Sequence, residues 1–172
     1  STINAGIGLT SFEAKLDGIP TTTTEGGMYG AQSSFSNHMN LKQSSLGFNG
    51  NVDYQRFFDS EHKSSITLSY LFSNSPSKNK SLRNQYQPSQ ANQDMYSDLE
   101  TNGRTHTLQV DLVNALTKNT TLNTGVKYIY RHNKSDSKYY DYNGDEQVLN
   151  ADRSIKYNND QSILAGYAEY VA

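Results

Sequence analysis

The sequence predicts an all-β protein, an antiparallel up-and-down meander of about six strands. Three observations support this fold class. Apolar and polar residues alternate along several long segments, as in strands with one apolar face. No segment shows a sustained helical period. The connections alternate in length, with tight turns at 59–63 and 118–119 and long polar loops near 18–40, 88–103 and 143–153.

The first three predicted strands cover 2–17, 41–58 and 64–86. In the first, apolar residues occupy one phase up to Leu9 and the other phase from Phe12 onward. Because the phase changes near Ser11, we expect a bulge or bend at that position.

The fourth and fifth strands form a hairpin over Thr105–His132, which turns at Lys118–Asn119. One face of this hairpin is apolar and the other is polar. The apolar face carries Leu108, Val110, Leu112, Leu122, Val126, Tyr128 and Tyr130. The fifth strand runs on through 133–143, and the sixth covers 154–171.

The composition is polar without being typical of disorder. Only 34% of the residues are hydrophobic and the mean hydropathy is -0.79, whereas ordinary domains have roughly 45–50% apolar residues. Disordered chains have few aromatic residues and a high net charge. This chain has 13 Tyr, 6 Phe and a net charge of -2. We therefore expect β-structure with many hydrated positions.

Several kinds of site and partner are not supported by the sequence. The absence of cysteine excludes disulfides and thiolate metal sites. The near-neutral charge gives no support for a nucleic-acid partner. The sequence contains no apolar run long enough for a transmembrane helix, no signal peptide and no phosphate-loop, nucleophile-elbow or HExxH motif. We expect neither an enzyme nor a bound cofactor.

Two environments could explain the alternating strands. In a soluble sheet, the polar face meets water and the apolar face packs into a dry core. In a transmembrane β-barrel, the apolar face meets lipid and the polar face lines a wet interior. Short turns at one end, long loops at the other, aromatic residues near strand ends and apolar windows of about 7–10 residues favour the barrel. A soluble barrel or sandwich that binds a ligand, or an adhesive surface module, is the alternative.

Six strands are too few for a closed membrane barrel, since the smallest single-chain barrels have about eight. We therefore interpret residues 1–172 as a single segment of a larger transmembrane β-barrel. An isolated segment would have to cover its apolar face in another way. Closure into a small barrel or sandwich, or pairing with a second copy as a homo-oligomer, are the two routes.

Several strand–turn–strand stretches carry a family resemblance. They include "NVDYQRFF", "LNTGVKYIYR" and "AGYAEY". From about Leu46 to Ala172 the chain resembles the barrel of TonB-dependent outer-membrane receptors, and more narrowly the outer-membrane β-barrel family common in Bacteroidota. The resemblance implies a location in the outer membrane and uptake of a nutrient, whose identity it does not reveal. It also implies a barrel of 22 strands with a plug domain, energised through TonB. The chain has no recognisable plug or TonB box, so outer-membrane lipid, the remaining barrel, the plug and TonB are the expected partners.

The candidate ligand contacts are three tyrosines, Tyr139, Tyr140 and Tyr142, in the sequence "SKYYDY". Tyrosine-rich external loops contact sugars and other planar ligands, since the rings bury large areas at low entropic cost. The simpler interpretation, which we favour, is that they pair across the sheet just beyond the membrane. The four histidines have no ligand spacing, and "DYNGDE" at 141–146 lacks the spacing of a calcium loop. No metal site is predicted.

Overall fold

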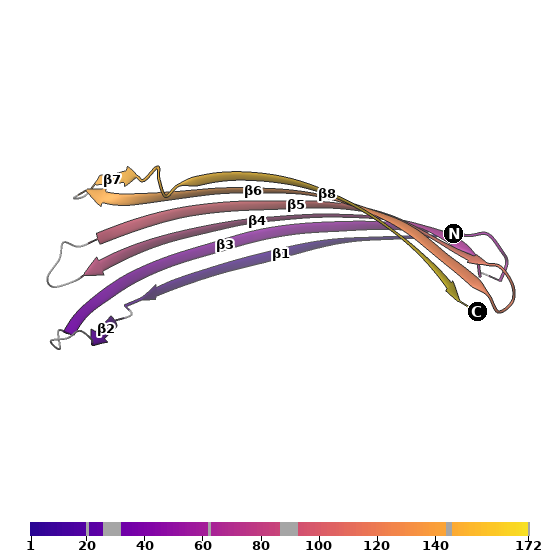
Figure 1. The fold of residues 1–172 in the computed structure, drawn as a ribbon, viewed down its shortest axis with the longest axis horizontal. Coiled ribbons are helices and arrows are strands. Elements are labelled where there is room, and N and C mark those ends of the chain that lie inside the picture. Colours follow the sequence, from indigo (N-terminus) through magenta and orange to yellow (C-terminus); the bar gives the residue numbers. More distant parts are fainter. Residues whose placement is uncertain (20, 26–31, 62, 87–92, 144–145, 172) are drawn as a thin grey trace.

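The computed structural model describes residues 1–19, 21–25, 32–61, 63–86, 93–143 and 146–171, and it forms one antiparallel sheet (Figure 1). The strands are β1 Thr2–Gly18, β2 Thr21–Glu25, β3 Gln32–Phe57, β4 Ser65–Tyr86, β5 Gln93–Ala115, β6 Thr121–Asn143, β7 Glu146–Leu149 and β8 Ile155–Val171. Six are long, and β2 and β7 are short. The expected all-β meander is confirmed.

Each long strand pairs with the next one along the chain. The sheet runs β1–β3–β4–β5–β6, and β8 pairs with β6 to complete it. The short strand β2 continues along β3 where β1 ends, and β7 pairs with the far end of β6. The long strands lie side by side in one curved layer, with β1 and β8 at its edges (Figure 1). The described parts of β1 and β8 do not pair with each other, so the sheet is open.

The expected bulge near Ser11 is wrong. The pairing of β1 with β3 runs unbroken from Thr2 to Gly18. The change of apolar phase has another cause, because residues up to Leu9 and residues from Phe12 onward lie on opposite faces of a regular strand. The strand itself stays regular, and its apolar residues move from one face of the sheet to the other near Ser11.

The three predicted long loops are partly strand. The segment near 18–40 contains β2 and the start of β3, the segment near 88–103 contains the start of β5, and the segment near 143–153 contains β7. These residues were expected to form loops because Ser, Thr, Asn and Gln gather there. Such residues are compatible with strands when the backbone is paired on a neighbour, as it is here.

No hydrophobic side chain among the described residues is buried. A single layer cannot enclose a core, because each face needs a second layer to cover it. Closure of this chain into a small barrel or sandwich is therefore not seen, whereas pairing with a second copy stays a prediction. The described residues include no helix of the length and hydrophobicity needed to cross a membrane.

Candidate functional site

The strand register sorts the side chains into two faces. Residues paired directly across strands lie on the same face. Leu108 pairs with Tyr128, and Tyr128 pairs with Leu164, so these three share one face, which we call the apolar face. Gln109 and Lys127 pair on the opposite side, which we call the polar face. The faces predicted for the hairpin are those observed.

The apolar face carries a continuous band of hydrophobic side chains over the part of each strand nearest the tight turns. The band is open to the surroundings, with Ile7 86%, Leu164 75% and Leu9 71% exposed. On each long strand, one residue is the last of the band in the direction of the long loops. In the order of the strands, these residues are Leu9, Leu46, Phe72, Leu108, Tyr130 and Leu164. We call this line the border of the band.

The border crosses the sheet obliquely. Leu164 is level in register with Val52, and Val52 lies six residues along β3 from Leu46. On β1 the border residue Leu9 is level with Phe48, so over all five steps from β1 to β8 the border moves four residues. At roughly 3.3 Å per residue and 4.8 Å between strands, this mean slope corresponds to strands tilted by about 30° from a level border. Strands of membrane barrels are likewise tilted, by about 35–45°.

Aromatic rings line the border. The ring centroids of Phe48 and Phe72 are 6.1 Å apart, those of Phe72 and His106 5.0 Å, and those of His106 and Tyr130 6.3 Å. The Tyr130 hydroxyl donates a hydrogen bond of 2.7 Å to Asp160. The rings thus remain with the apolar band while the polar atoms face the other way, as in the aromatic belts at a lipid–water boundary.

Beyond the border, the same face is charged. Lys78 pairs with Glu100, and Lys80 pairs with Asp98 at 3.1 Å. The hydrogen bond from the Lys78 ammonium holds the pKa of the Glu100 carboxyl below its usual value. The hydrogen bond to Asp98 raises the pKa of the Lys80 ammonium. These bonds favour the charged forms of Glu100 and Lys80, and this part of the face is suited to water.

The polar face has cross-strand contacts of its own. The Tyr167 ring lies over Gly125, and its hydroxyl donates a 2.9 Å hydrogen bond to Asp111 on the strand beyond. Gln109 donates a 2.7 Å hydrogen bond to the same carboxylate group. A Cβ at position 125 would overlap the Tyr167 ring, so glycine is required for this close approach. One side chain thereby links β8 to β5 across β6.

Near the β1 edge of the sheet, asparagine side chains of β3 cover two glycines of β1. The Asn51 side chain leans over Gly6, and Asn49 leans over Gly8. Asn51 also donates a 3.1 Å hydrogen bond to Asp53. This face therefore offers amide, hydroxyl and carboxylate groups, which suit the wall of a hydrated interior.

An exposed apolar band, tilted strands and a polar reverse face describe the wall of a membrane barrel. The model of a family described as "Outer membrane protein beta-barrel family" matches residues 55–172, more than half of the chain. The chain belongs to this family. Its place is the outer membrane, as expected. In a membrane barrel the apolar face is the one that meets lipid.

No curated protein sequence matches the chain. Among solved structures, the chain is similar to one described as "CryoEM structure of the membrane pore complex of Pneumolysin at 4.5A", with 6% sequence identity and a TM-score of 0.21. The alignment covers 97% of this chain and 31% of that chain.

The three candidate tyrosines do not form one cluster. Tyr140 and Tyr142 lie on the apolar face beyond the border, whereas Tyr139 lies on the polar face. The Tyr140 ring is 5.7 Å from that of its cross-strand partner Tyr96. The Tyr142 hydroxyl accepts a 2.6 Å hydrogen bond from Gln147, and the Arg153 guanidinium lies 5.5 Å from the Tyr139 ring. Ligand contact by these residues stays a prediction, and of the three only Tyr139 lies on the polar face.

The histidines are engaged in pairwise contacts. His106 hydrogen-bonds the Tyr70 hydroxyl at 2.8 Å, His132 bonds Asp160 at 2.7 Å, and His38 bonds Asp17 at 2.6 Å. His62 and positions 144–145 of "DYNGDE" lie outside the described residues. Among the described residues, no group of three or more His, Asp or Glu side chains could hold a metal ion.

The Tyr167–Gly125–Asp111 contact was missed by sequence reasoning. The three residues are far apart in the chain and come together only through the registers of two strand pairs. The available signal was a glycine inside a strong strand pattern, which indicates close approach but does not identify the neighbour.

Proposed function

We propose that the chain forms part of the barrel wall of a TonB-dependent receptor of the Bacteroidota type, which takes up a nutrient across the outer membrane. The observation that carries the proposal is the open sheet. In lipid, unpaired backbone groups at a strand edge are costly, so β1 and β8 require further strands. A larger barrel supplies those strands, and the resemblance from Leu46 onward supports this class of receptor.

In this proposal, the polar face lines the interior and contacts the plug, and the strands extend well beyond the outer border of the membrane. β4 continues from Phe72 to Tyr86, so it runs roughly 46 Å past the border. Long extensions of this kind support external loops that admit a ligand. Tyr139 is the candidate ligand contact on the interior side, and we expect no catalytic or cofactor role for this chain.

The soluble-module alternative needs a dry core beneath the apolar face. Leu108 is 50% exposed and Val126 is 53% exposed, with no second layer over them among the described residues. No observation favours that alternative, so we do not propose it.

The proposal is tested with the full reading frame that contains this segment. Deletion strains lacking the protein, TonB or both are grown on panels of scarce iron, vitamin and glycan sources. We expect the same defect in all three strains on one nutrient class, and binding of the purified full-length protein to the periplasmic domain of TonB. Normal growth of the strain that lacks only TonB on the nutrient that the protein-deletion strain cannot use, together with no TonB binding, contradicts the proposal.

A further inference from the structure

Beyond the border, the apolar face carries cations at a nearly constant distance. Each of five adjacent strands has one cationic residue on this face, located four or six residues beyond its border residue. These cations are Lys15, Lys42, Lys78, Arg104 and Lys134. At a tilt of about 30–45°, this places them roughly 9–17 Å above the border. That is the level of the polar headgroups of the outer leaflet.

Three members of this set, Lys42, Arg104 and Lys134, have no counter-charge among the described residues, and the last two lie on neighbouring strands. Lys15 pairs with Glu13 at 3.1 Å, and Lys78 pairs with Glu100. By contrast, the cationic groups of Arg104 and Lys134 make no ion pair or hydrogen bond within the described part of the chain, and both side chains are exposed. The nearby carboxylate of Asp160 is held by His132 and by Tyr130.

Arg104 and Lys134 lie close together on neighbouring strands. Asn102 pairs with Lys134, so Arg104 is its diagonal neighbour two residues along β5. Diagonal neighbours on one face are about 7–8 Å apart, within reach for two long cationic side chains to meet at one anion. An arginine and a lysine so placed are well suited to a phosphate group.

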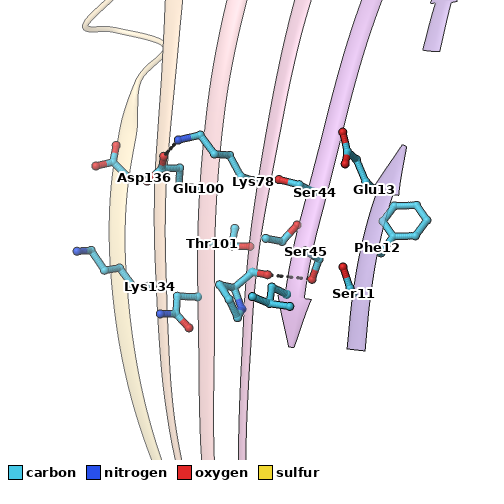
Figure 2. Close-up of a pocket in the computed structure, with 14 residues that line it drawn as sticks. Ser11, Phe12, Glu13, Ser44, Ser45, Lys78, Glu100, Thr101, Lys134 and Asp136 are labelled. Carbon is cyan, nitrogen blue, oxygen red and sulfur yellow. Dashed lines mark hydrogen bonds and ion pairs between the residues drawn. The ribbon is translucent and has the colours of Figure 1, made fainter. Parts of the chain in front are cut away.

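Lys134 lines a hollow of about 570 Å³ (Figure 2). Its lining includes Lys134, Asn102 and Ser44, and also the carboxylates of Glu100 and Asp136. Figure 2 shows Lys78 reaching to Glu100. The Asp136 carboxylate lies 3.9 Å from the Lys156 ammonium. The lining therefore combines an uncompensated lysine with hydroxyl, amide and carboxylate groups that can hydrogen-bond the hydroxyls of a sugar.

We propose that this surface binds a phosphorylated glycolipid of the outer leaflet, with the phosphate on Arg104 and Lys134 and the sugar in the adjoining hollow. The position selects a lipid over a soluble ligand, because the site lies on the lipid-facing side directly above the apolar band. A lipid held there would cover the band with its acyl chains while its headgroup neutralises the two cations. The inference depends on the outer-membrane location and not on the uptake role.

The test uses the full-length protein, freed of lipid in detergent and titrated with a diphosphorylated glycolipid (lipid A). Replacement of both cations, Arg104→Gln with Lys134→Gln, is expected to weaken binding about fivefold for each charge removed at low ionic strength. The matched control is Lys127→Gln with Arg131→Gln, which removes the same charges from the polar face of β6. The control should bind as the unmodified protein does.

Four results would overturn the proposal. Three of them are unchanged binding by the Arg104/Lys134 variant, equal weakening by the control, and equal binding of the dephosphorylated glycolipid. Inorganic phosphate that competes at millimolar concentration would also overturn it, since the site would then be one for a free anion. If the double variant fails to fold, as judged by heat-modifiable mobility, the charge-retaining exchange Arg104→Lys with Lys134→Arg replaces it. That exchange must keep lipid binding within about threefold of the unmodified protein, given the modest difference between the two cations at an exposed site.

Discussion

The apolar and polar faces are built from alternate residues of the same strands, yet they are stabilised in different ways. On β6, Val126 and Tyr128 point to lipid, whereas Gly125 and Lys127 belong to the polar face. The apolar face has little internal contact and depends on the membrane to cover it. The polar face depends on hydrogen bonds between neighbouring strands, such as the one from Tyr167 to Asp111. A single layer can therefore be stable only when both environments are supplied from outside.

This difference makes register the critical property of the sheet. A slip of one residue would place every lipid-facing side chain on the interior wall, and the reverse. The contacts that fix register are consequently as important to this protein as a packed core is to a soluble one. Each of the following changes acts on one face, or on the turn that keeps the two faces apart.

The largest effect is expected from a charge in the apolar band. Val126 lies near the middle of the band on β6 and is 53% exposed. Val126→Lys places an ammonium in lipid, which costs about 2–4 kcal/mol at the bilayer midplane. The free energy of unfolding of the full-length protein in lipid, measured by urea titration, should fall by that amount.

The matched control is Ile129→Lys, because Ile129 is a branched aliphatic residue of the same strand on the polar face. Its loss should be less than half that of Val126→Lys, since the new ammonium meets a hydrated interior. Equal losses for the two variants, or a larger loss for Ile129→Lys, would contradict the assignment of the faces.

A smaller effect is expected on the polar face. In Gly125→Ala, the new methyl group would overlap the Tyr167 ring and lie 2.5 Å from the Asp111 Oδ1 atom, so the ring must move away. The hydrogen bond from Tyr167 to Asp111 is then lost, and we expect a loss of about 1–3 kcal/mol in the free energy of unfolding.

A double-mutant cycle with Tyr167→Phe separates this contact from general crowding. If the two changes act through the same hydrogen bond, their combined cost is smaller than the sum of the single costs. Gly166→Ala is the control, because its new methyl group would meet only a backbone oxygen at 3.6 Å. Additive costs, or an equal loss for Gly166→Ala, would show that Tyr167 is not held in this way.

The sequence predicted the faces well, because alternation has a local cause. The period of two along Leu108, Val110 and Leu112 is imposed by the strand itself, and so the apolar face, the meander and the tight turns could be read directly. The limits of β4 and β8 were also close to those observed.

Two kinds of feature could not be read from the sequence. The polar starts of β3 and β5 resemble loops, because Ser, Asn and Gln are also turn formers and only pairing with a neighbour makes them strands. Contacts such as Tyr167 with Asp111, or Arg104 beside Lys134, depend on registers between strands, which alternation alone does not fix. The sequence thus indicates which way a side chain points more reliably than it identifies the neighbour.

The smallest effect is expected at the turn between β3 and β4, where both faces end together. The Asp59 carboxylate accepts hydrogen bonds from the backbone N–H groups of Lys63, at 2.8 Å, and Ser64, at 2.7 Å. The bond from Lys63 is the main cause that lowers the pKa of this carboxyl below its ordinary 3.8. A group whose pKa is lowered by folding stabilises the protein above its unfolded pKa, and this contribution is lost as the pH falls through the folded pKa.

The full-length protein should therefore lose stability relative to Asp59→Asn as the pH is lowered from 5 toward 2, as measured by urea titration at each pH. At pH 7 the unmodified protein should be slightly the more stable of the two, because a charged acceptor binds backbone N–H groups more strongly than an amide does. The control Glu61→Gln keeps every backbone donor of the turn and should leave the Asp59-dependent difference in place. A difference between the unmodified protein and Asp59→Asn that does not change with pH would show that the carboxylate does not hold this turn, and that the register of β3 on β4 is set by the strands alone.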